Sequence, residues 1–224
     1  MADMQGINNY WNQLTDAELK QGAHRRRVGG LWDEIGALQF QYLKDQGLLP
    51  SQVLFDVGCG AMRGGLYFIR YLESGNYVGL DINESLLKAG RQEIDAAGLA
   101  EKHPTLIQDS DFDFGKIGRK ADLALAVSLF THLPMNIIIR CLLSLRPHLS
   151  KDGTFYATFF ECPEGEVLTS IERFSGRQSH FDADPFHYPP SIIRWMAEYC
   201  GYRLERFGDW GHPRNQKMAV LRPA

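Results

Sequence analysis

The stretch VLFDVGCGAMRGG, residues 53–65, decides how the rest of this chain can be arranged. Its apolar start predicts a short strand, its glycines predict a tight turn, and the residues after them predict the start of a helix. Such a turn leaves backbone N–H groups uncovered at the carboxyl edge of a sheet, where open α/β folds bind nucleotide-like ligands. The sequence therefore predicts an α/β fold with a ligand site at this turn.

The glycine turn departs from the dinucleotide-binding fingerprint at one position. The third glycine of G-x-G-x-x-G would fall at Arg63. Asp56, two residues before the first glycine, would lie badly beside a pyrophosphate but suits a ligand that carries an ammonium group. The pattern D-V-G-C-G resembles the first motif of class I S-adenosylmethionine (SAM)-dependent methyltransferases, with Asp56, Gly58 and Gly60 at the motif positions. An NAD-linked oxidoreductase is the alternative enzyme.

A second acidic position agrees with this resemblance. Residues 76–81 predict a strand that ends in Asp81, at the spacing of the carboxylate that binds ribose hydroxyls about 20 residues after a glycine turn. The alternative is that Asp81 caps the helix that begins near Glu84, although Asn83 already suits that role.

Alternating strands and helices continue along the chain. Five helices are expected, near residues 31–46, 62–73, 84–97, 134–149 and 191–200. Seven strands are expected, at residues 53–57, 76–81, 104–108, 121–127, 154–160, 202–207 and 217–221. The resemblance implies a doubly wound, mostly parallel seven-stranded sheet with an antiparallel terminal strand.

Length and composition indicate a single domain, residues 1–224. The chain has 224 residues, of which 44% are hydrophobic, enough for one well-buried domain with modest insertions. Residues 1–48 are expected to form a helical N-terminal cap, and the irregular segment 161–189 an insertion on the acceptor side. The formal net charge of −3 gives no general attraction to nucleic acid or to an anionic membrane.

The four cysteines are far apart and form no C-x-x-C pair, so neither a disulfide framework nor a zinc site is indicated. Reduced thiols suit the cytoplasm, which is the predicted location. No signal peptide and no uninterrupted apolar stretch of membrane-spanning length is seen.

Two later segments extend the resemblance. Asp109 follows the third strand, where the family has an acid that contacts adenine, although Asp111, Asp113 and a plain turn are alternatives. Residues 128–134, SLFTHLP, resemble the family's fourth motif but lack its N-P-P-Y form, which disfavours methylation of nucleobase amino groups or glutamine amides. The resemblance implies SAM as cofactor, bound by Asp56, Gly58, Cys59, Gly60, Arg63, Asp81, Ile82, Asp109, Ser110 and Ser128.

The acceptor side is expected to hold a general base. The SAM sulfonium makes its methyl group electrophilic, so the protein mainly has to align the acceptor and exclude water. An oxygen or nitrogen acceptor that is protonated at neutral pH benefits from a base, and histidine is the first choice. His187 and His132 are the predicted catalytic residues, with His187 preferred, and for each the alternative is a structural role.

Contacts with the acceptor are predicted for Tyr10, Trp11, His180 and Tyr188. Aromatic side chains in these segments could instead pack surface loops onto the core. The segment 180–187 contains four potential metal ligands, His180, Asp182, Asp184 and His187. Their spacing is not a recognised ligand spacing, so no metal site is predicted.

The sequence thus predicts an enzyme that transfers a methyl group from SAM to a small-molecule acceptor, at oxygen or nitrogen. Neither nucleic acid nor a membrane is expected as a partner. Two alternatives stay open: a catalytically silent SAM-binding module, and a methyltransferase that acts on a macromolecule.

Overall fold

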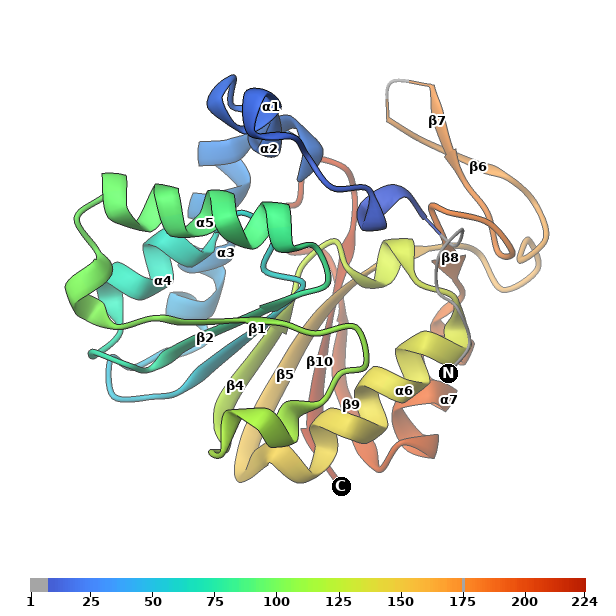
Figure 1. Cartoon of the computed structure of the whole chain (residues 1–224). Helices are drawn as coiled ribbons and strands as arrows, with labels where there is room; N and C mark the ends of the chain where they lie inside the picture. The colour runs from blue at the N-terminus through green and yellow to red at the C-terminus, as the bar shows by residue number, and fades with distance from the viewer. Residues whose placement is uncertain (1–7, 175) are drawn as a thin grey trace. The chain divides into compact units, whose positions relative to one another are not determined.

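A computed structural model describes residues 8–174 and 176–224 (Figure 1). The chain divides into two compact units, one of residues 10–110 and the other of residues 111–224 with residues 8–9. Each unit contains parallel strands connected by helices, which is the α/β pattern expected from the sequence.

The unit of residues 10–110 contains three parallel strands in the order β3-β2-β1. These are β1 (Leu54–Val57), β2 (Tyr77–Asp81) and β3 (Thr105–Gln108). Their connections contain α4 (Gly65–Tyr71), α5 (Glu84–Ala96) and the short 3-10 helix η2 (Ala100–Lys102). Because the strands are parallel, their carboxyl ends all lie at one edge, which carries the glycine turn.

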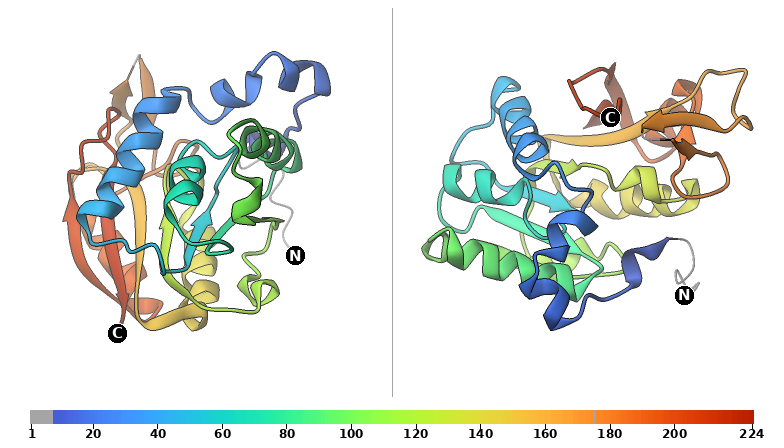
Figure 2. Two further views of the ribbon diagram at one scale, coloured as in Figure 1. Left: turned by 90° about the vertical axis from the view of Figure 1, so that its left-hand side faces the viewer. Right: turned by 90° about the horizontal axis from the view of Figure 1, so that it is seen from above.

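Three helices precede β1 in this unit: α1 (Asp16–Lys20), α2 (Ala23–Arg27) and α3 (Trp32–Asp45), with the 3-10 helix η1 (Asn9–Trp11) before them. Thr15 and Glu18 form a reciprocal capping box that starts α1. Helix α3 packs beside α4, as Figure 2 shows.

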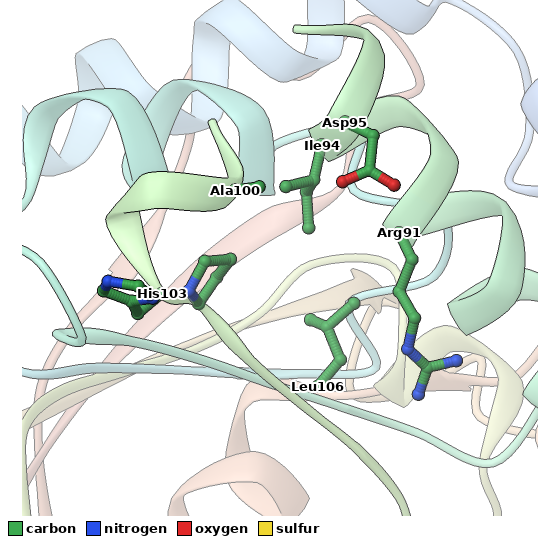
Figure 3. A pocket seen from close by; sticks show the side chains of 7 residues that line it. Arg91, Ile94, Asp95, Ala100, His103 and Leu106 are labelled. Atoms are coloured by element: carbon green, nitrogen blue, oxygen red, sulfur yellow. The ribbon is translucent and has the colours of Figure 1, made fainter. Parts of the chain in front are cut away.

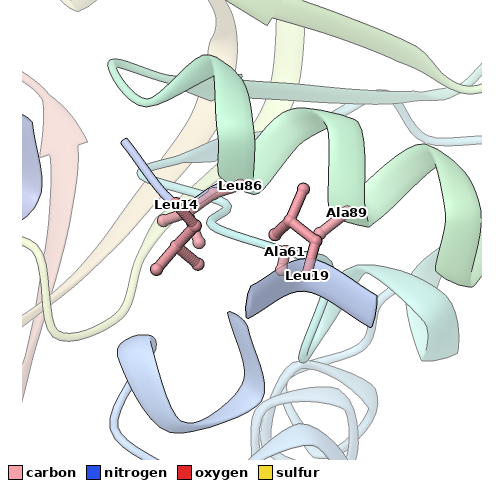
Figure 4. Close-up of a cluster of buried hydrophobic side chains, with 5 residues drawn as sticks. All are labelled: Leu14, Leu19, Ala61, Leu86 and Ala89. Carbon is pink, nitrogen blue, oxygen red and sulfur yellow. The ribbon is translucent and has the colours of Figure 1, made fainter. Parts of the chain in front are cut away.

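The segment before and within α1 packs onto the glycine turn and α5. Leu14 and Leu19 contact Ala61 of the turn and Leu86 and Ala89 of α5 in one buried apolar cluster (Figure 4). Burial of this apolar surface stabilises the attachment of the N-terminal segment.

The unit of residues 111–224 contains four strands in the order β4-β5-β10-β9. Strands β4 (Ala121–Ala126) and β5 (Leu149–Glu161) are parallel, whereas β10 (Lys217–Pro223) runs antiparallel to β5 and to β9 (Tyr202–Gly208). The helices of this unit are α6 (Met135–Leu145) and α7 (Pro190–Tyr199), with the 3-10 helices η3 (Phe114–Ile117), η4 (Phe130–His132) and η5 (Arg146–His148). The mostly parallel sheet with one antiparallel strand confirms the predicted fold class.

Two of the sequence-based predictions differ from the structure. The helix predicted to run to residue 149 ends at Leu145, because Pro147 lacks an N–H group, and Leu149 begins β5. The segment 161–189 is not wholly irregular: it contains the hairpin of β6 (Ile171–Phe174) and β7 (Arg177–Ser179), which projects from the sheet in Figure 1. It also contains the two-residue strand β8 (His187–Tyr188), which pairs with β5.

All four cysteines are buried free thiols. Within residues 8–174 and 176–224, no helix is both long and apolar enough to cross a membrane.

A buried polar pair lies beneath the glycine turn. The Tyr77 hydroxyl donates a 2.7 Å hydrogen bond to Asp56 Oδ2, and both residues are buried. A Cβ atom on Gly65 would lie only 2.6 Å from the same hydroxyl, so the first residue of α4 has to be glycine. Burial raises the pKa of Asp56 from its ordinary value of 3.8 to about 6, opposed by the hydrogen bond from Tyr77.

This pKa predicts how stability depends on pH. Between pH 4 and pH 6 the folded protein holds a proton on Asp56 that the unfolded chain has released, so the free energy of unfolding falls as pH rises through about 6. Asp56→Asn, which can still accept from Tyr77, should remove this contribution of roughly 3 kcal/mol and be the more stable protein at pH 7.5. Urea denaturation of both proteins from pH 4.5 to 8 measures it, with Asp152→Asn at an exposed position as the control. Parallel pH profiles for wild type and Asp56→Asn would contradict this assignment.

Candidate active site

The glycine turn needs glycine at two positions, because of its backbone angles and its close neighbours. Gly58 and Gly60 adopt φ of 74° and 55°, in the left-handed region that glycine occupies readily. A Cβ atom on Gly60 would lie 2.8 Å from Val28 Cγ1, so the neighbouring loop leaves no room for a side chain at position 60. The turn is therefore a tightly enclosed cradle of backbone atoms.

Asp81 connects this turn to the start of α5. Its Oδ2 accepts the Gly60 N–H at 2.8 Å, and its Oδ1 accepts the Asn83 N–H at 2.9 Å. Burial raises the pKa of Asp81, and these backbone hydrogen bonds oppose the shift. Backbone groups of Gly60, Asn83 and Ile82 all act on this carboxylate, which has about four lone-pair positions, so it can still accept from a ligand. The binding of both ribose hydroxyls by Asp81 stays a prediction.

Asn83 and Ser85 fasten the N-terminal segment to the same turn. Asn83 Nδ2 donates to the carbonyls of Tyr10 (2.7 Å) and Asn12 (3.0 Å), while its Oδ1 caps α5 by accepting the Leu86 N–H at 3.2 Å. Ser85 Oγ accepts the Leu14 N–H at 2.8 Å. The sequence indicated only the capping role, and no local pattern indicates the contacts with residues 10–14.

Arg63 and Cys59 make contacts inside this unit rather than at an open surface. The buried Arg63 guanidinium donates to the carbonyls of Val28 (2.6 Å) and Gly30 (3.3 Å), so it holds the loop that covers Gly60. Cys59 is buried against Gly79, and burial raises the pKa of its thiol. These contacts favour a role in shaping the turn, and direct cofactor contacts by both residues stay predictions.

Asp56, whose Oδ2 accepts from Tyr77, likewise lies beneath the turn, and its contact with the cofactor stays a prediction. The other predicted cofactor residues of this unit lie at the carboxyl ends of β2 and β3. The Asp109 N–H donates to the Asp81 carbonyl at 3.0 Å, and Gln108 Nε2 donates to the Ile82 carbonyl at 3.2 Å. Asp109 and Ser110 are half-buried. The structure thus gathers the predicted set around one sheet edge.

The unit of residues 10–110 also has a hollow that lies away from the glycine turn (Figure 3). It is lined by Arg91, Ile94, Asp95, Ala100, His103, Pro104 and Leu106. These residues come from the second half of α5 and the approach to β3, so the hollow is distinct from the glycine turn.

In the unit of residues 111–224, Ser128 follows β4 in an unusual conformation. Its φ of 60° is a left-handed value that residues other than glycine seldom adopt. The Ser128 N–H donates to Thr158 Oγ1 at 2.7 Å, and its hydroxyl donates to Gln216 Oε1 at 3.1 Å. Such strained positions cluster at functional sites.

His132, at the end of η4, pairs with a carboxylate from the segment that the sequence assigned to the acceptor side. Its Nδ1 lies 2.5 Å from Asp184 Oδ1, and the two side chains are 22% and 25% exposed. The Phe186 N–H donates to the Thr131 carbonyl at 2.7 Å, which fixes the Asp184 segment beside η4. Asp184 was not among the predicted catalytic residues, because its partner is 52 residues away.

The structure favours a structural role for His187. The residue is 0% exposed, and its ring nitrogens lie 2.9 Å from Ser179 Oγ and 3.0 Å from the Val167 carbonyl. Burial lowers its pKa, which keeps the ring neutral. Of the two predicted bases, His132 is therefore the one whose surroundings suit proton transfer.

Tyr188 and His180 are also engaged within the protein. Tyr188 is 1% exposed and donates to the Leu133 carbonyl at 2.9 Å, which favours packing over the predicted acceptor contact. His180 Nδ1 lies 2.8 Å from Ser170 Oγ. Tyr10 and Trp11 are half-buried in η1, and their predicted contact with the acceptor stays a prediction. No group of three or more potential metal ligands occurs in the part of the chain that the structure describes.

Comparisons with known proteins agree with this geometry. A family model described as a methyltransferase domain matches residues 55–155, from β1 into β5. Among solved structures, the magnesium protoporphyrin IX methyltransferase of Synechocystis PCC 6803 with bound SAM is similar over 96% of this chain and 88% of its own, at 15% identity and a TM-score of 0.64.

Two further structures show the same fold. A SAM-dependent methyltransferase from Clostridium acetobutylicum ATCC 824 is similar over 94% of this chain and 100% of its own, at 11% identity and a TM-score of 0.67. The glycopeptide N-methyltransferase MtfA with bound SAM is similar over 84% of this chain and 94% of its own, at 14% identity and a TM-score of 0.64. The match to a methyltransferase-domain model over residues 55–155 and these structural similarities show that the chain has the fold of SAM-dependent methyltransferases.

Proposed function

We propose that this protein transfers the methyl group of SAM to an oxygen or nitrogen atom of a small-molecule acceptor, with His132 as general base. The observation that carries the choice of base is the His132–Asp184 pair, which is partly exposed and follows the carboxyl end of β4. A silent SAM-binding module has no need of such a pair, so the pair favours catalysis over the binding-module alternative.

The residues at the glycine turn fit the cofactor. The glycines let the backbone turn tightly beside Asp81, whose carboxylate suits ribose hydroxyls. When bound, SAM supplies an electrophilic methyl group on its sulfonium. The residues proposed to hold it are those around the turn, Gly58, Gly60 and Asp81, with Ile82, Asp109 and Ser110 at the adjoining strand ends.

The roles of His132 and Asp184 follow from their contact. A carboxylate at Nδ1 accepts the Nδ1–H and so places the lone pair of the neutral ring on Nε2. Nε2 would remove the proton from the acceptor O–H or N–H, and bound SAM would supply the methyl group, with S-adenosylhomocysteine as the leaving group. Asp184 stabilises the resulting imidazolium, as a carboxylate does in other histidine-carboxylate pairs.

Three observations support a small molecule as the acceptor. Two of the similar structures are methyltransferases for magnesium protoporphyrin IX and for a glycopeptide. The segment 128–134 lacks an N-P-P-Y motif, and the net charge of −3 offers no general attraction to nucleic acid. A macromolecular acceptor is the second candidate, and a mass screen separates the two.

That screen is the direct test of the proposed function. Purified protein, SAM with a trideuterated methyl group and the low-molecular-mass fraction of a cell extract should give at least one labelled small molecule by mass spectrometry. Label found only in protein or nucleic acid, when the whole extract is used, would contradict the small-molecule assignment.

Cofactor affinity tests the role of Asp81. Asp81→Ala should weaken binding of SAM and of its product S-adenosylhomocysteine (SAH) about 10-fold to 100-fold, because two buried ribose hydroxyls lose their acceptor. Isothermal titration calorimetry measures this, with NAD as a ligand that should not bind. The exposed Asp152→Ala is the matched control. Wild-type affinity in a folded Asp81→Ala protein would show that the carboxylate only connects the turn to α5.

The base is tested by a pH profile. His132→Asn should lower kcat about 100-fold or more at neutral pH while leaving SAH affinity near wild type, because a positioned base contributes on the order of 10²–10⁴ in rate. Raising the pH should restore turnover, since the acceptor then loses its proton to the solvent. Asp184→Asn should lower kcat less, and His103→Asn, at an exposed position on the other unit, should change neither value. A pH-independent loss in His132→Asn would make this residue a positioning residue only.

A further inference from the structure

A buried amide lies at the carboxyl edge of the strands in the unit of residues 111–224. Gln216 immediately precedes β10, and the next-but-one residue, Met218, pairs with Thr158 of β5. Ser128 follows the neighbouring strand β4. The three side chains therefore meet where open α/β sheets bind their ligands.

Two hydroxyl groups hold one end of this amide. Gln216 Oε1 accepts from Thr158 Oγ1 at 2.7 Å and from Ser128 Oγ at 3.1 Å. Thr158 Oγ1 in turn accepts the Ser128 N–H at 2.7 Å. Both acceptor positions of Oε1 are used, so the orientation of the whole amide is fixed by its neighbours.

The other end of the amide has no such partners. Gln216 is only 3% exposed, yet its Nε2 donates no hydrogen bond to any residue in 8–174 or 176–224. Gln216 Nε2 is not completely shielded from solvent. Because Nε2 keeps some access to solvent and donates to no described residue, a ligand at this edge can accept its hydrogen bonds.

We infer that Gln216 is a specificity-determining residue, whose Nε2–H groups bind an oxygen of the acceptor near the atom to be methylated. The inference rests on the proposed small-molecule function and narrows the acceptor to one that carries a carbonyl, carboxylate or similar hydrogen-bond acceptor. Ser128 and Thr158 act as positioning residues that hold the amide. The strained φ of Ser128 is then a consequence of placing its hydroxyl and N–H in this network.

Two substitutions separate this role from a structural one. Gln216→Glu keeps an oxygen for both hydroxyls but replaces the N–H₂ donor with an acceptor, whereas Gln216→Met keeps the volume and loses every hydrogen bond. A purely structural Gln216 predicts that Glu is tolerated and Met is harmful. Recognition of an acceptor oxygen predicts the opposite order, because Glu then repels that oxygen.

The experiment uses the acceptor that trideuterated SAM labels in the low-molecular-mass fraction of a cell extract. Gln216→Glu should raise the KM for that acceptor about 10-fold or more, and Gln216→Met less, with SAH affinity and Tm near wild type. Gln92→Glu, on the exposed face of α5, is the matched control and should keep the wild-type KM.

A second readout uses the wild-type protein. The Gln216 side-chain amide signal in an NMR spectrum, assigned by its loss in Gln216→Met, should shift when this acceptor is added to the SAH complex. An unchanged KM in Gln216→Glu, or an unmoved amide signal at saturating acceptor, overturns the inference alone. If wild-type protein labels no small molecule, the proposed function fails and this inference fails with it.

Discussion

The hydrogen bonds of the Asp81 carboxylate connect the parts of the unit of residues 10–110 at which we propose that SAM binds. One oxygen accepts from the glycine turn at Gly60, and the other accepts from Asn83 at the start of α5. Because Asp81 is half-buried, these donors replace part of the water that its carboxylate loses. Asn83 in turn donates to the backbone carbonyls of Tyr10 and Asn12. Further along α5, Glu93 accepts from Arg25 and lies 2.7 Å from a ring nitrogen of His24. One acidic side chain thereby connects the turn, a helix start and the N-terminal segment.

The other unit builds its site in a similar way, from strand ends that fix side chains in the loops that follow. Ser128 and His132 come after β4, Thr158 lies on β5, and Gln216 precedes β10. A rigid sheet positions these loops, and the loops carry the groups that suit chemistry. In the proposed function, Gln216 recognises the acceptor and the His132–Asp184 pair moves the proton.

Sequence reasoning found the features that depend on near neighbours along the chain. The glycine turn, the Asp81 spacing and the cap at Asn83 are local patterns, and so are most strand and helix positions. It missed contacts between distant residues: Asp184 lies 52 positions from His132, Tyr10 lies 73 from Asn83, and Ser128 lies 88 from Gln216. The sequence also did not predict β8, which pairs with β5 and in which the side chains of His187 and Tyr188 are buried. The role of His187 as a base stays a prediction, which this burial disfavours. Nothing in the composition of that short segment signals such a strand.

The central claim is that the cofactor binds at the turn held by Asp81. Amide hydrogen exchange of the wild-type protein, with and without SAH, tests it most directly, because exchange reports local opening residue by residue. If SAH binds at this turn, residues 58–60, residues 81–86 and the attached segment 10–14 gain protection from exchange. Unchanged exchange in these three segments with SAH bound, or protection confined to the hollow near Arg91 and His103, would contradict it.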